Sequence, residues 1–313
     1  MSKWKVLITD EIKDNGKKIL NLTAEVDDRN GILEDELKEI VHQYNAIIVR
    51  GRTKVTADLL DTARNLAVIG RAGVGVDNID LAAAQYKKIT VVNSPNATTI
   101  AVAEHTLGLM LSLVRKIPKA DSSMKSGQWQ KNRFLGTELY NKTLGIIGVG
   151  RIGSMVAKKA SAFNMHVLGY DPNVESNIML QQGIESVDLS ELLSRSDIIT
   201  LHVPYCSDTK NMIDGQVMGL MKRGVRIICT ARGGIIDETA LLAGLESGQI
   251  AGAALDVYQD EPPGLTALVA HPNVIATPHI GAQTHEAQIR ASEDIATEVI
   301  RALNNEPLRW KIV

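Results

Sequence analysis

The chain has 313 residues, about twice the usual size of a single domain, so we expect two domains. Hydrophobic residues make up 44% of it, aromatic residues 4%, and the formal net charge is -2. This composition is typical of a globular protein and lacks the basic excess that favours binding to nucleic acids or anionic membranes. We therefore expect neither of these partners.

The sequence also lacks the signals typical of secretion and of membrane insertion. The first ten residues, MSKWKVLITD, lack the apolar core and cleavage site of a signal peptide, and no stretch approaches the length of a membrane span. Cys206 and Cys229 form no Cys-x-x-Cys pair. We expect neither a disulfide framework nor a thiolate metal site, and the sequence predicts a cytoplasmic protein.

Short runs of Val, Ile and Leu recur in the first hundred residues and alternate with helical patterns. The runs predicted as strands are KVLIT at 5–9, AIIVR at 46–50, LAVIGR at 66–71 and TVVN at 90–93. This alternation predicts a parallel sheet with helices on both faces. A helical pattern over 100–115, ending near Pro118, is then expected to lead into a second domain.

A second and longer series of apolar runs begins at residue 143 and predicts a second doubly wound parallel sheet. Its predicted strands lie within 143–153, 166–171, 197–204, 225–230, 251–257 and 273–279. An amphipathic helix is predicted over 286–303 without companion strands nearby, and the final WKIV is a candidate strand. We expect this tail to pack on the first domain, which gives domains of 1–98 with 284–313, and of 99–283.

The motif GVGRIG follows the apolar run that ends at Ile147 and opens a helical pattern. In this context Gly148, Gly150 and Gly153 allow a tight turn and a close approach of the backbone to a pyrophosphate, as in dinucleotide-binding folds. Asp171 ends the next predicted strand, near the spacing of about 20 residues expected for a ribose-binding carboxylate. No arginine follows it directly, which favours NAD over NADP. A glycine turn that binds nothing, and Asp171 as a cap or turn residue, stay open.

Arg232 follows the predicted strand at 225–230 directly, in the sequence VRIICTARGGIID. Burying an unpaired guanidinium costs on the order of several kcal/mol, so it needs either solvent or an anion. Open α/β sheets bind ligands at the carboxyl ends of their strands, and a guanidinium fork suits a carboxylate. The sequence therefore predicts a small anionic substrate at Arg232, with a surface arginine as the alternative.

Glu261 in DVYQDEPP and His279 in TPHIG follow the next two predicted strands. Because such strand ends cluster in space, an arginine, a carboxylate and an imidazole can converge there. Histidine carries protons near neutral pH, and a neighbouring carboxylate favours its charged form. We predict acid/base catalysis by this set. Singly, a hydrogen-bonded structural histidine and a solvated loop acid remain the alternatives.

Basic residues also follow strand ends in the first domain, at VRGRTK (49–54) and GRAGVGVDN (70–78). They create a positive field there, and the glycine-rich backbone is expected to form an anion-binding nest at the start of a helix near Ile79. A second anionic group on the substrate, such as a phosphate, would suit this region; a solvated basic face is the alternative. The predicted substrate contacts are Arg50, Arg52, Arg71, Val74 and Gly75.

These motifs, together with HVP at 202–204, resemble the D-isomer-specific 2-hydroxyacid dehydrogenases in the family's order and over essentially the whole chain. The resemblance implies a Rossmann-type NAD-binding domain, a smaller flavodoxin-like substrate domain and a homodimer formed through the nucleotide domain. It implies Arg232 as the carboxylate anchor, His279 as acid/base and Glu261 as its partner. Implied cofactor contacts are Arg151, Ile152, Asp171, Val203, Thr230, Ala231 and Asp256. Cys229 departs from the family, where Asn is common.

RAGVGVDNIDL at 71–81 and FLGTEL at 134–139 resemble the phosphoglycerate-oxidising group of that family. This resemblance implies NAD-dependent oxidation of D-3-phosphoglycerate to 3-phosphohydroxypyruvate in serine biosynthesis. Because the sequence stops at Val313, we expect a short form without the regulatory domain of longer relatives. Arg133 is a candidate to supplement the phosphate site across a dimer.

Three other functions remain open from the sequence. A glyoxylate, hydroxypyruvate or D-lactate reductase would use the same three side chains. A formate dehydrogenase is disfavoured, because relatives of that kind have Gln where Glu261 stands. An NADH-sensing corepressor would bind the cofactor without turning over a hydroxy acid.

Overall fold

The computed structural model describes residues 3–313, which form two compact units. Unit 1 holds the described residues up to Thr99 together with Ala282–Val313, and unit 2 is Ile100–Gly281. The borders expected from the sequence lie within two residues of these, and residues 1 and 2 lie outside the described part. That each unit folds independently as a domain stays a prediction.

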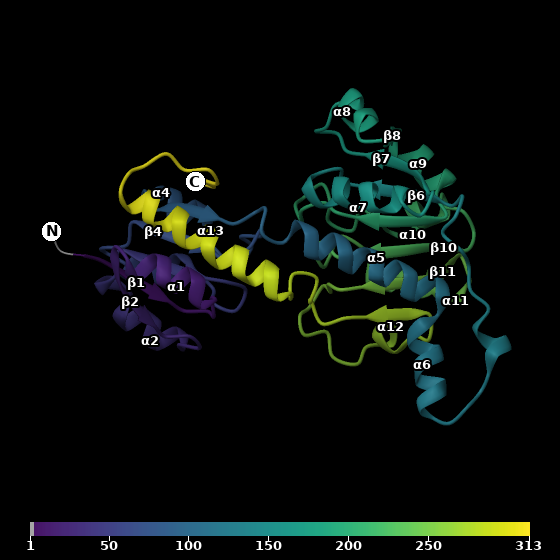
Figure 1. The fold of residues 1–313 in the computed structure, drawn as a ribbon, viewed down its shortest axis with the longest axis horizontal. Helices are drawn as coiled ribbons and strands as arrows, with labels where there is room; N and C mark the ends of the chain where they lie inside the picture. Colours follow the sequence, from purple (N-terminus) through teal and green to yellow (C-terminus); the bar gives the residue numbers. More distant parts are fainter. Residues whose placement is uncertain (1–2) are drawn as a thin grey trace. The chain divides into compact units, whose positions relative to one another are not determined.

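Unit 1 contains a five-stranded, all-parallel sheet in the order β2-β1-β3-β4-β5 (Figure 1). This order is that of flavodoxin-like folds, so the predicted class is confirmed. The strands are β1 (Trp4–Ile8), β2 (Ala24–Asp28), β3 (Ala46–Val49), β4 (Val68–Arg71) and β5 (Thr90–Asn93). Strand β2 was not predicted. Only its first residue is buried, because it is an edge strand, so its sequence AEVDD carries almost no apolar signal.

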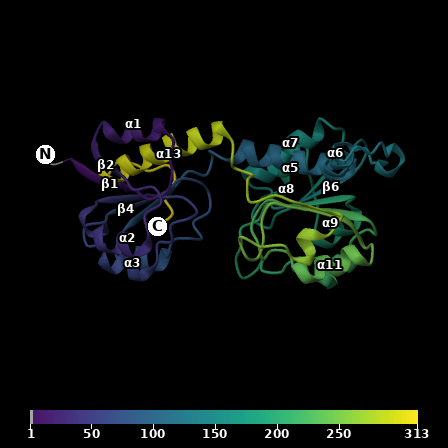
Figure 2. The same cartoon turned by 90° about the horizontal axis from the view of Figure 1, so that it is seen from below.

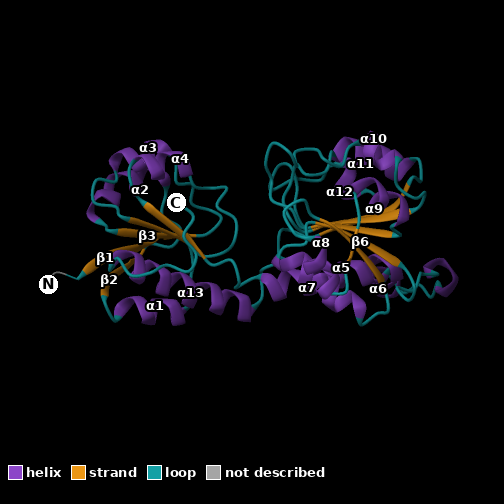
Figure 3. Cartoon of the chain, turned by 90° about the horizontal axis from the view of Figure 1, so that it is seen from above, coloured by secondary structure: helices purple, strands orange, loops and turns teal. Residues whose placement is uncertain are grey.

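Helices cover both faces of this sheet (Figure 3). One face carries α1 (Asp14–Asn21) and α13 (His285–Leu303); the other carries α2 (Glu34–Ile40), α3 (Ala57–Thr62) and α4 (Leu81–Tyr86), with a 3-10 turn at Val41–Gln43. Val6 and Ile8 point to the α1/α13 side and Leu7 to the other, as the two-residue period of a strand requires. Strands buried on both faces therefore read as continuous apolar runs.

The C-terminal tail packs against unit 1, as the sequence predicted. Helix α13 lies beside α1, although the two are far apart in the sequence (Figure 2). Gly16 of α1 permits this contact, because a Cβ there would lie 2.4 Å from the carbonyl oxygen of Ser292. The predicted terminal strand is reduced to one antiparallel bridge between Val92 and Lys311.

Unit 2 contains a seven-stranded parallel sheet in the order β12-β11-β10-β9-β6-β7-β8. Counted from β6, this is the Rossmann order with one added strand, which confirms the predicted class. The strands are β6 (Thr143–Ile147), β7 (His166–Tyr170), β8 (Glu185–Ser186), β9 (Ile198–Leu201), β10 (Val225–Cys229), β11 (Ile250–Leu255) and β12 (Val274–Ala276). Only the two-residue strand β8 was missed.

The helices of unit 2 also lie on both faces of its sheet. One face packs on α5 (Thr99–Arg115) and α7 (Arg151–Ser161), and the other on α9 (Leu189–Arg195), α10 (Gly215–Gly219), α11 (Glu238–Glu246) and α12 (Ala267–Ala270). The remaining helices are α6 (Ile117–Lys125), α8 (Ser176–Gln181) and a 3-10 turn at Lys131–Phe134. In the described residues, no helix is both long enough and apolar enough to cross a membrane.

Helix α6 was not predicted, because Pro118 was interpreted as the end of the preceding helix. Instead Pro118 lies in the first turn of α6. Proline is tolerated there because its missing N–H would have no partner within the helix in any case. The break between α5 and α6 is made by Lys116, which has a left-handed backbone with φ 56°.

Candidate active site

The glycine motif forms the turn between β6 and α7. Gly148 has φ +93°, and a Cβ there would lie 2.7 Å from the carbonyl oxygen of His202. A Cβ on Gly153 would lie 2.1 Å from the carbonyl oxygen of Gly148, so this position needs glycine for packing. Gly150 has no neighbour within 4 Å of where a Cβ would be. The turn is therefore closed on its protein side and open at Gly150.

Gly150 is also the N-cap residue of α7, and no side chain caps this helix. Asp188 caps α9 and Asp237 caps α11, whereas α6 and α8 also lack a side-chain cap. Uncapped amides at the start of an eleven-residue helix, beside an open glycine, suit the pyrophosphate of a dinucleotide. The turn therefore fits such a cofactor. Of the flanking predicted contacts, Arg151 is exposed and Ile152 is partly buried.

Asp171 lies directly after β7, at the rim of the glycine turn. Its Oδ2 accepts a hydrogen bond from the amide of Val149 at 2.9 Å, and its Oδ1 accepts one from the amide of Asn173 at 2.9 Å. The carboxylate thus ties the next strand end to the glycine turn. These two hydrogen bonds give Asp171 a role in the turn, and a ribose contact by the same carboxylate stays a prediction.

The other predicted cofactor contacts follow the neighbouring strands. Val203 and Ala231 are partly buried, Thr230 is 7% exposed, and Asp256 is 1% exposed. The hydroxyl of Thr230 lies 3.0 Å from that of Thr106 in α5. The side chains of Thr230 and Asp256 are therefore engaged inside unit 2, and their contact with a cofactor stays a prediction.

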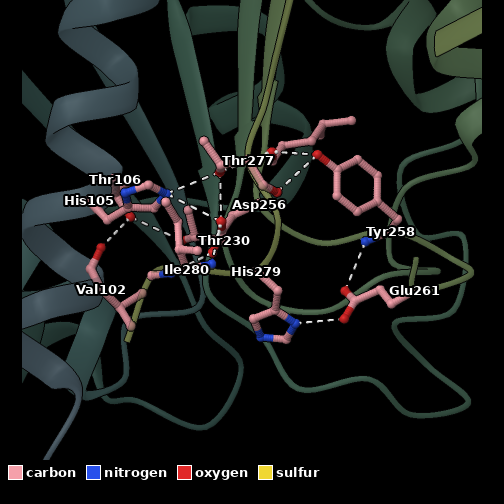
Figure 4. Close-up of polar contacts among 12 residues, drawn as sticks. Val102, His105, Thr106, Thr230, Asp256, Tyr258, Glu261, Thr277, His279 and Ile280 are labelled. Atoms are coloured by element: carbon pink, nitrogen blue, oxygen red, sulfur yellow. Dashed lines mark hydrogen bonds and ion pairs between the residues drawn. The ribbon is translucent and has the colours of Figure 1, made fainter. Parts of the chain in front are cut away.

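His279 and Glu261 meet at the carboxyl edge of the same sheet. His279 Nδ1 lies 2.7 Å from Glu261 Oε2 (Figure 4). Because an ionised carboxylate only accepts, Nδ1 must donate, which leaves Nε2 on the other side of the ring for a ligand. The two side chains are 48% and 37% exposed, so the pair is accessible.

Several charges and donors converge on Glu261. Burial alone would raise its pKa, but the hydrogen bond and charge of His279, the amide of Tyr258 and the charge of Arg232 together outweigh burial. The net result is a pKa below the usual value, so Glu261 is ionised near neutral pH. Arg232 lies three residues beyond β10, is partly buried, and donates to the carbonyl oxygen of Ala231 at 2.7 Å. All three predicted residues thus lie beyond strand ends of one sheet.

Sequence reasoning missed Tyr258 and Thr277, which connect the two loops of this pair. The Tyr258 hydroxyl donates to the carbonyl oxygen of Thr277 at 3.1 Å, and its amide donates to Glu261 Oε1 at 3.1 Å. Burial raises the pKa of Tyr258 to about 12, so it stays a donor. Their position in the sequence could have indicated them, since Tyr258 and Thr277 lie within three residues of Glu261 and His279, respectively.

The predicted basic residues of unit 1 lie at or just beyond strand ends, but their environments differ. Arg52 donates to the carbonyl oxygens of Thr9 at 2.6 Å and Ile32 at 3.0 Å, and its guanidinium lies 3.1 Å from Asp10. Arg50 is partly buried, which lowers its pKa. The guanidinium of Arg52 is therefore occupied within unit 1.

The backbone nest expected before a helix near Ile79 stays a prediction, but the start of that helix is already capped. Helix α4 begins at Leu81, and the side chain of Asp80 caps it by accepting from the amide of Ala83. An anion at this helix end would meet the Asp80 carboxylate, so the cap does not favour the predicted contribution of the helix to anion binding. Val74 and Gly75 lie in the preceding loop, where Val74 is 36% exposed. The guanidinium of Arg71 lies against Gly73 in the same loop.

Comparison with known proteins identifies the family. Residues 107–281, more than half of the chain, match the model of the D-isomer specific 2-hydroxyacid dehydrogenase NAD binding domain. The chain belongs to the D-isomer-specific 2-hydroxyacid dehydrogenase family. This match covers nearly all of unit 2, including the glycine turn and the His279–Glu261 pair.

Family relatives extend the similarity to the whole chain. It is 48% identical over 303 residues to the D-3-phosphoglycerate dehydrogenase of Methanocaldococcus jannaschii, covering 96% of this chain and 58% of that protein. The chain thus spans little more than half the length of this relative. The glyoxylate reductase structure from Paecilomyes thermophila has a TM-score of 0.92 at 29% identity, covering 100% of this chain and 99% of that one.

A second solved structure bears on the cofactor. An acyclic imino acid reductase in complex with NADPH and D-Arg has a TM-score of 0.88 at 29% identity, covering 99% of this chain and 100% of that one. The fold therefore accommodates nicotinamide dinucleotides with and without a 2'-phosphate.

Cys229, the departure from the family pattern, is buried at the end of β10. It is 2% exposed, and burial raises the pKa of its thiol to about 11. Its Sγ lies 3.8 Å from the carbonyl oxygen of Arg232. The thiol therefore behaves as a small apolar group with a weak donor.

Proposed function

We propose that the protein oxidises D-3-phosphoglycerate to 3-phosphohydroxypyruvate with NAD. The observation that carries this proposal is the 2.7 Å contact between His279 and Glu261, on the sheet edge that bears an open glycine turn. The identity to D-3-phosphoglycerate dehydrogenases supports the choice of substrate. Such an activity would serve serine biosynthesis.

In this proposal His279 is the acid/base. Neutral Nε2 accepts the proton of the substrate's C2 hydroxyl, while the C2–H bond breaks and the carbon–oxygen double bond forms. NAD supplies the hydride acceptor. Glu261 holds the Nδ1–H and stabilises the imidazolium that results. The reverse reaction requires His279 to be protonated first.

Arg232 is assigned to the substrate carboxylate. Its position beyond β10 and its electrostatic effect on Glu261 support this role. A planar guanidinium can bind both carboxylate oxygens at once, which fixes the orientation of C2. In unit 1, Arg50, Arg71 and the Val74–Gly75 backbone are assigned to substrate binding, while Arg52 is more occupied by its own unit.

The remaining features of the proposal concern cofactor and assembly. Asp171 beside the glycine turn favours NAD, because a carboxylate repels the 2'-phosphate of NADP. We also propose a homodimer in the cytoplasm. Both cysteines are free thiols, which suits a reducing compartment.

The test is NADH absorbance with a panel of acids. D-3-phosphoglycerate, D-glycerate and D-lactate are each offered with NAD and with NADP, and glyoxylate and hydroxypyruvate with NADH. We expect the highest kcat/KM for phosphoglycerate with NAD. Preference for an unphosphorylated acid would replace the substrate assignment, and tight NADH binding without turnover would indicate a sensing protein instead.

A further inference from the structure

A second histidine–carboxylate pair lies beside the first. His105, in the second turn of α5, has its Nε2 3.3 Å from Asp256 Oδ1 (Figure 4). Its side chain is 20% exposed and that of Asp256 is 1% exposed, against 48% and 37% for His279 and Glu261. This inner pair is therefore shielded from solvent.

The hydrogen-bond pattern fixes the role of His105. The Thr277 hydroxyl donates its single proton to Asp256 Oδ1 at 2.6 Å. It must therefore act as acceptor toward His105 Nε2, which lies 3.2 Å away. Nε2 thus carries a proton that is shared between the Thr277 hydroxyl and the Asp256 carboxylate.

Asp256 is kept ionised by its donors. Burial alone would raise its pKa, but hydrogen bonds from His105, from Thr277 and from the amides of Ile280 and Gly281 outweigh burial and lower it. The two amides lie 2.9 and 2.8 Å from the carboxylate oxygens. Asp256 therefore holds the chain on both sides of His279, at Thr277 before it and at Ile280 and Gly281 after it.

His279 itself has a backbone that needs such support. Its φ of 51° lies in the left-handed region, which residues other than glycine rarely adopt. Strain of this kind persists only where the surrounding contacts determine it. If the loop relaxed to a negative φ, the imidazole would turn away from Glu261.

We infer that His105 is a positioning residue, which acts through Asp256 and Thr277 to hold His279 against Glu261. The inference rests on the proposed acid/base role of His279. Without the Nε2 donor, the carboxylate loses one of its compensating hydrogen bonds and the Thr277 side chain loses its partner. The His279 loop then samples conformations in which the contact to Glu261 is broken.

The test compares His105→Leu with His105→Gln. Leucine removes the donor, whereas the glutamine amide nitrogen reaches about as far from the backbone as Nε2. His166→Leu, at the exposed start of β7, is the matched control. We expect His105→Leu to lower kcat about 10- to 100-fold, because small misplacements of catalytic groups have effects of this size. KM and the dissociation constant of NADH should stay within about threefold, and His105→Gln should recover most of kcat.

A second readout does not depend on turnover. The 15N shifts of the His279 ring, measured through its carbon-bound protons, report the fraction protonated at Nδ1 in neutral imidazole. This fraction should be high in the wild type, in His105→Gln and in His166→Leu, and should fall toward that of a free imidazole in His105→Leu.

Two results would overturn the inference. One is a His105→Leu protein with wild-type kcat and wild-type ring shifts. The other is a loss of kcat that follows a loss of thermal stability and is not recovered by glutamine, which would make His105 merely structural. A wild type inactive on every acid, with ring shifts that still respond to His105→Leu, would contradict the proposed function while supporting the positioning.

Discussion

The carboxyl edges of the two sheets carry charged residues at equivalent places, but use them differently. In unit 2, Glu261 and His279 contact each other, and Arg232 acts electrostatically on Glu261. In unit 1, the guanidinium of Arg52 is bound to carbonyl oxygens of its own unit. A strand-end position therefore predicts where a charge lies, but not whether it is available to a ligand.

This difference in availability follows from the partners of a buried carboxylate at each sheet edge, Asp10 in unit 1 and Asp256 in unit 2. Asp10 of unit 1 is 4% exposed and accepts from the amide of Arg50 at 2.6 Å and from the Thr53 hydroxyl at 2.7 Å. A buried carboxylate needs such partners, and Arg52 is one of them. In unit 2 the corresponding buried carboxylate is Asp256. Its partners are uncharged donors and His105, so it needs no hydrogen bond from Arg232 or from the ring of His279.

The largest expected effect is at His279. His279→Gln should lower kcat by about 10² to 10⁴, the usual worth of a general acid/base, while NADH still binds. Initial rates and NADH fluorescence titration measure the two quantities. A variant with near wild-type kcat would mean that the exposed pair is not the reacting one.

Arg232→Lys separates charge from geometry at the same edge. It keeps the positive charge but loses the planar fork, so we expect a loss of about 1.5 to 3 kcal/mol in transition-state stabilisation, which lowers kcat/KM roughly 10- to 150-fold. Most of this decrease should come from a higher KM for the acid. Near wild-type kinetics would argue against bidentate binding of a carboxylate.

Arg52→Gln tests the opposite role in unit 1 and should have the smallest effect. Loss of its hydrogen bonds should reduce the free energy of unfolding by roughly 1 kcal/mol, discounted because the side chain is 48% exposed. Denaturant unfolding measures this, with the exposed Arg64→Gln as control. The preference for phosphorylated over plain acids should not change; a loss of that preference would place Arg52 among the substrate contacts.

Much of the fold was predictable because buried parallel strands have a strong apolar signal. Strand β3, for example, was located from the four consecutive apolar residues AIIV. The two missed strands share a cause, since β2 and β8 are edge strands with at most one buried residue each. The sequence also located Glu261 and His279 beyond neighbouring strands, although their catalytic roles stay predictions.

The sequence by itself determined the two sheets, the glycine turn and the set of charged residues after strand ends, because these depend on local periodicity and backbone freedom. Only the tertiary structure decided which charges are already paired. His105 and Asp256 lie far apart along the chain and meet only when α5 packs beside β11. Pairing of residues so far apart in the sequence depends on how whole helices and strands pack, and local sequence periodicity does not predict that packing.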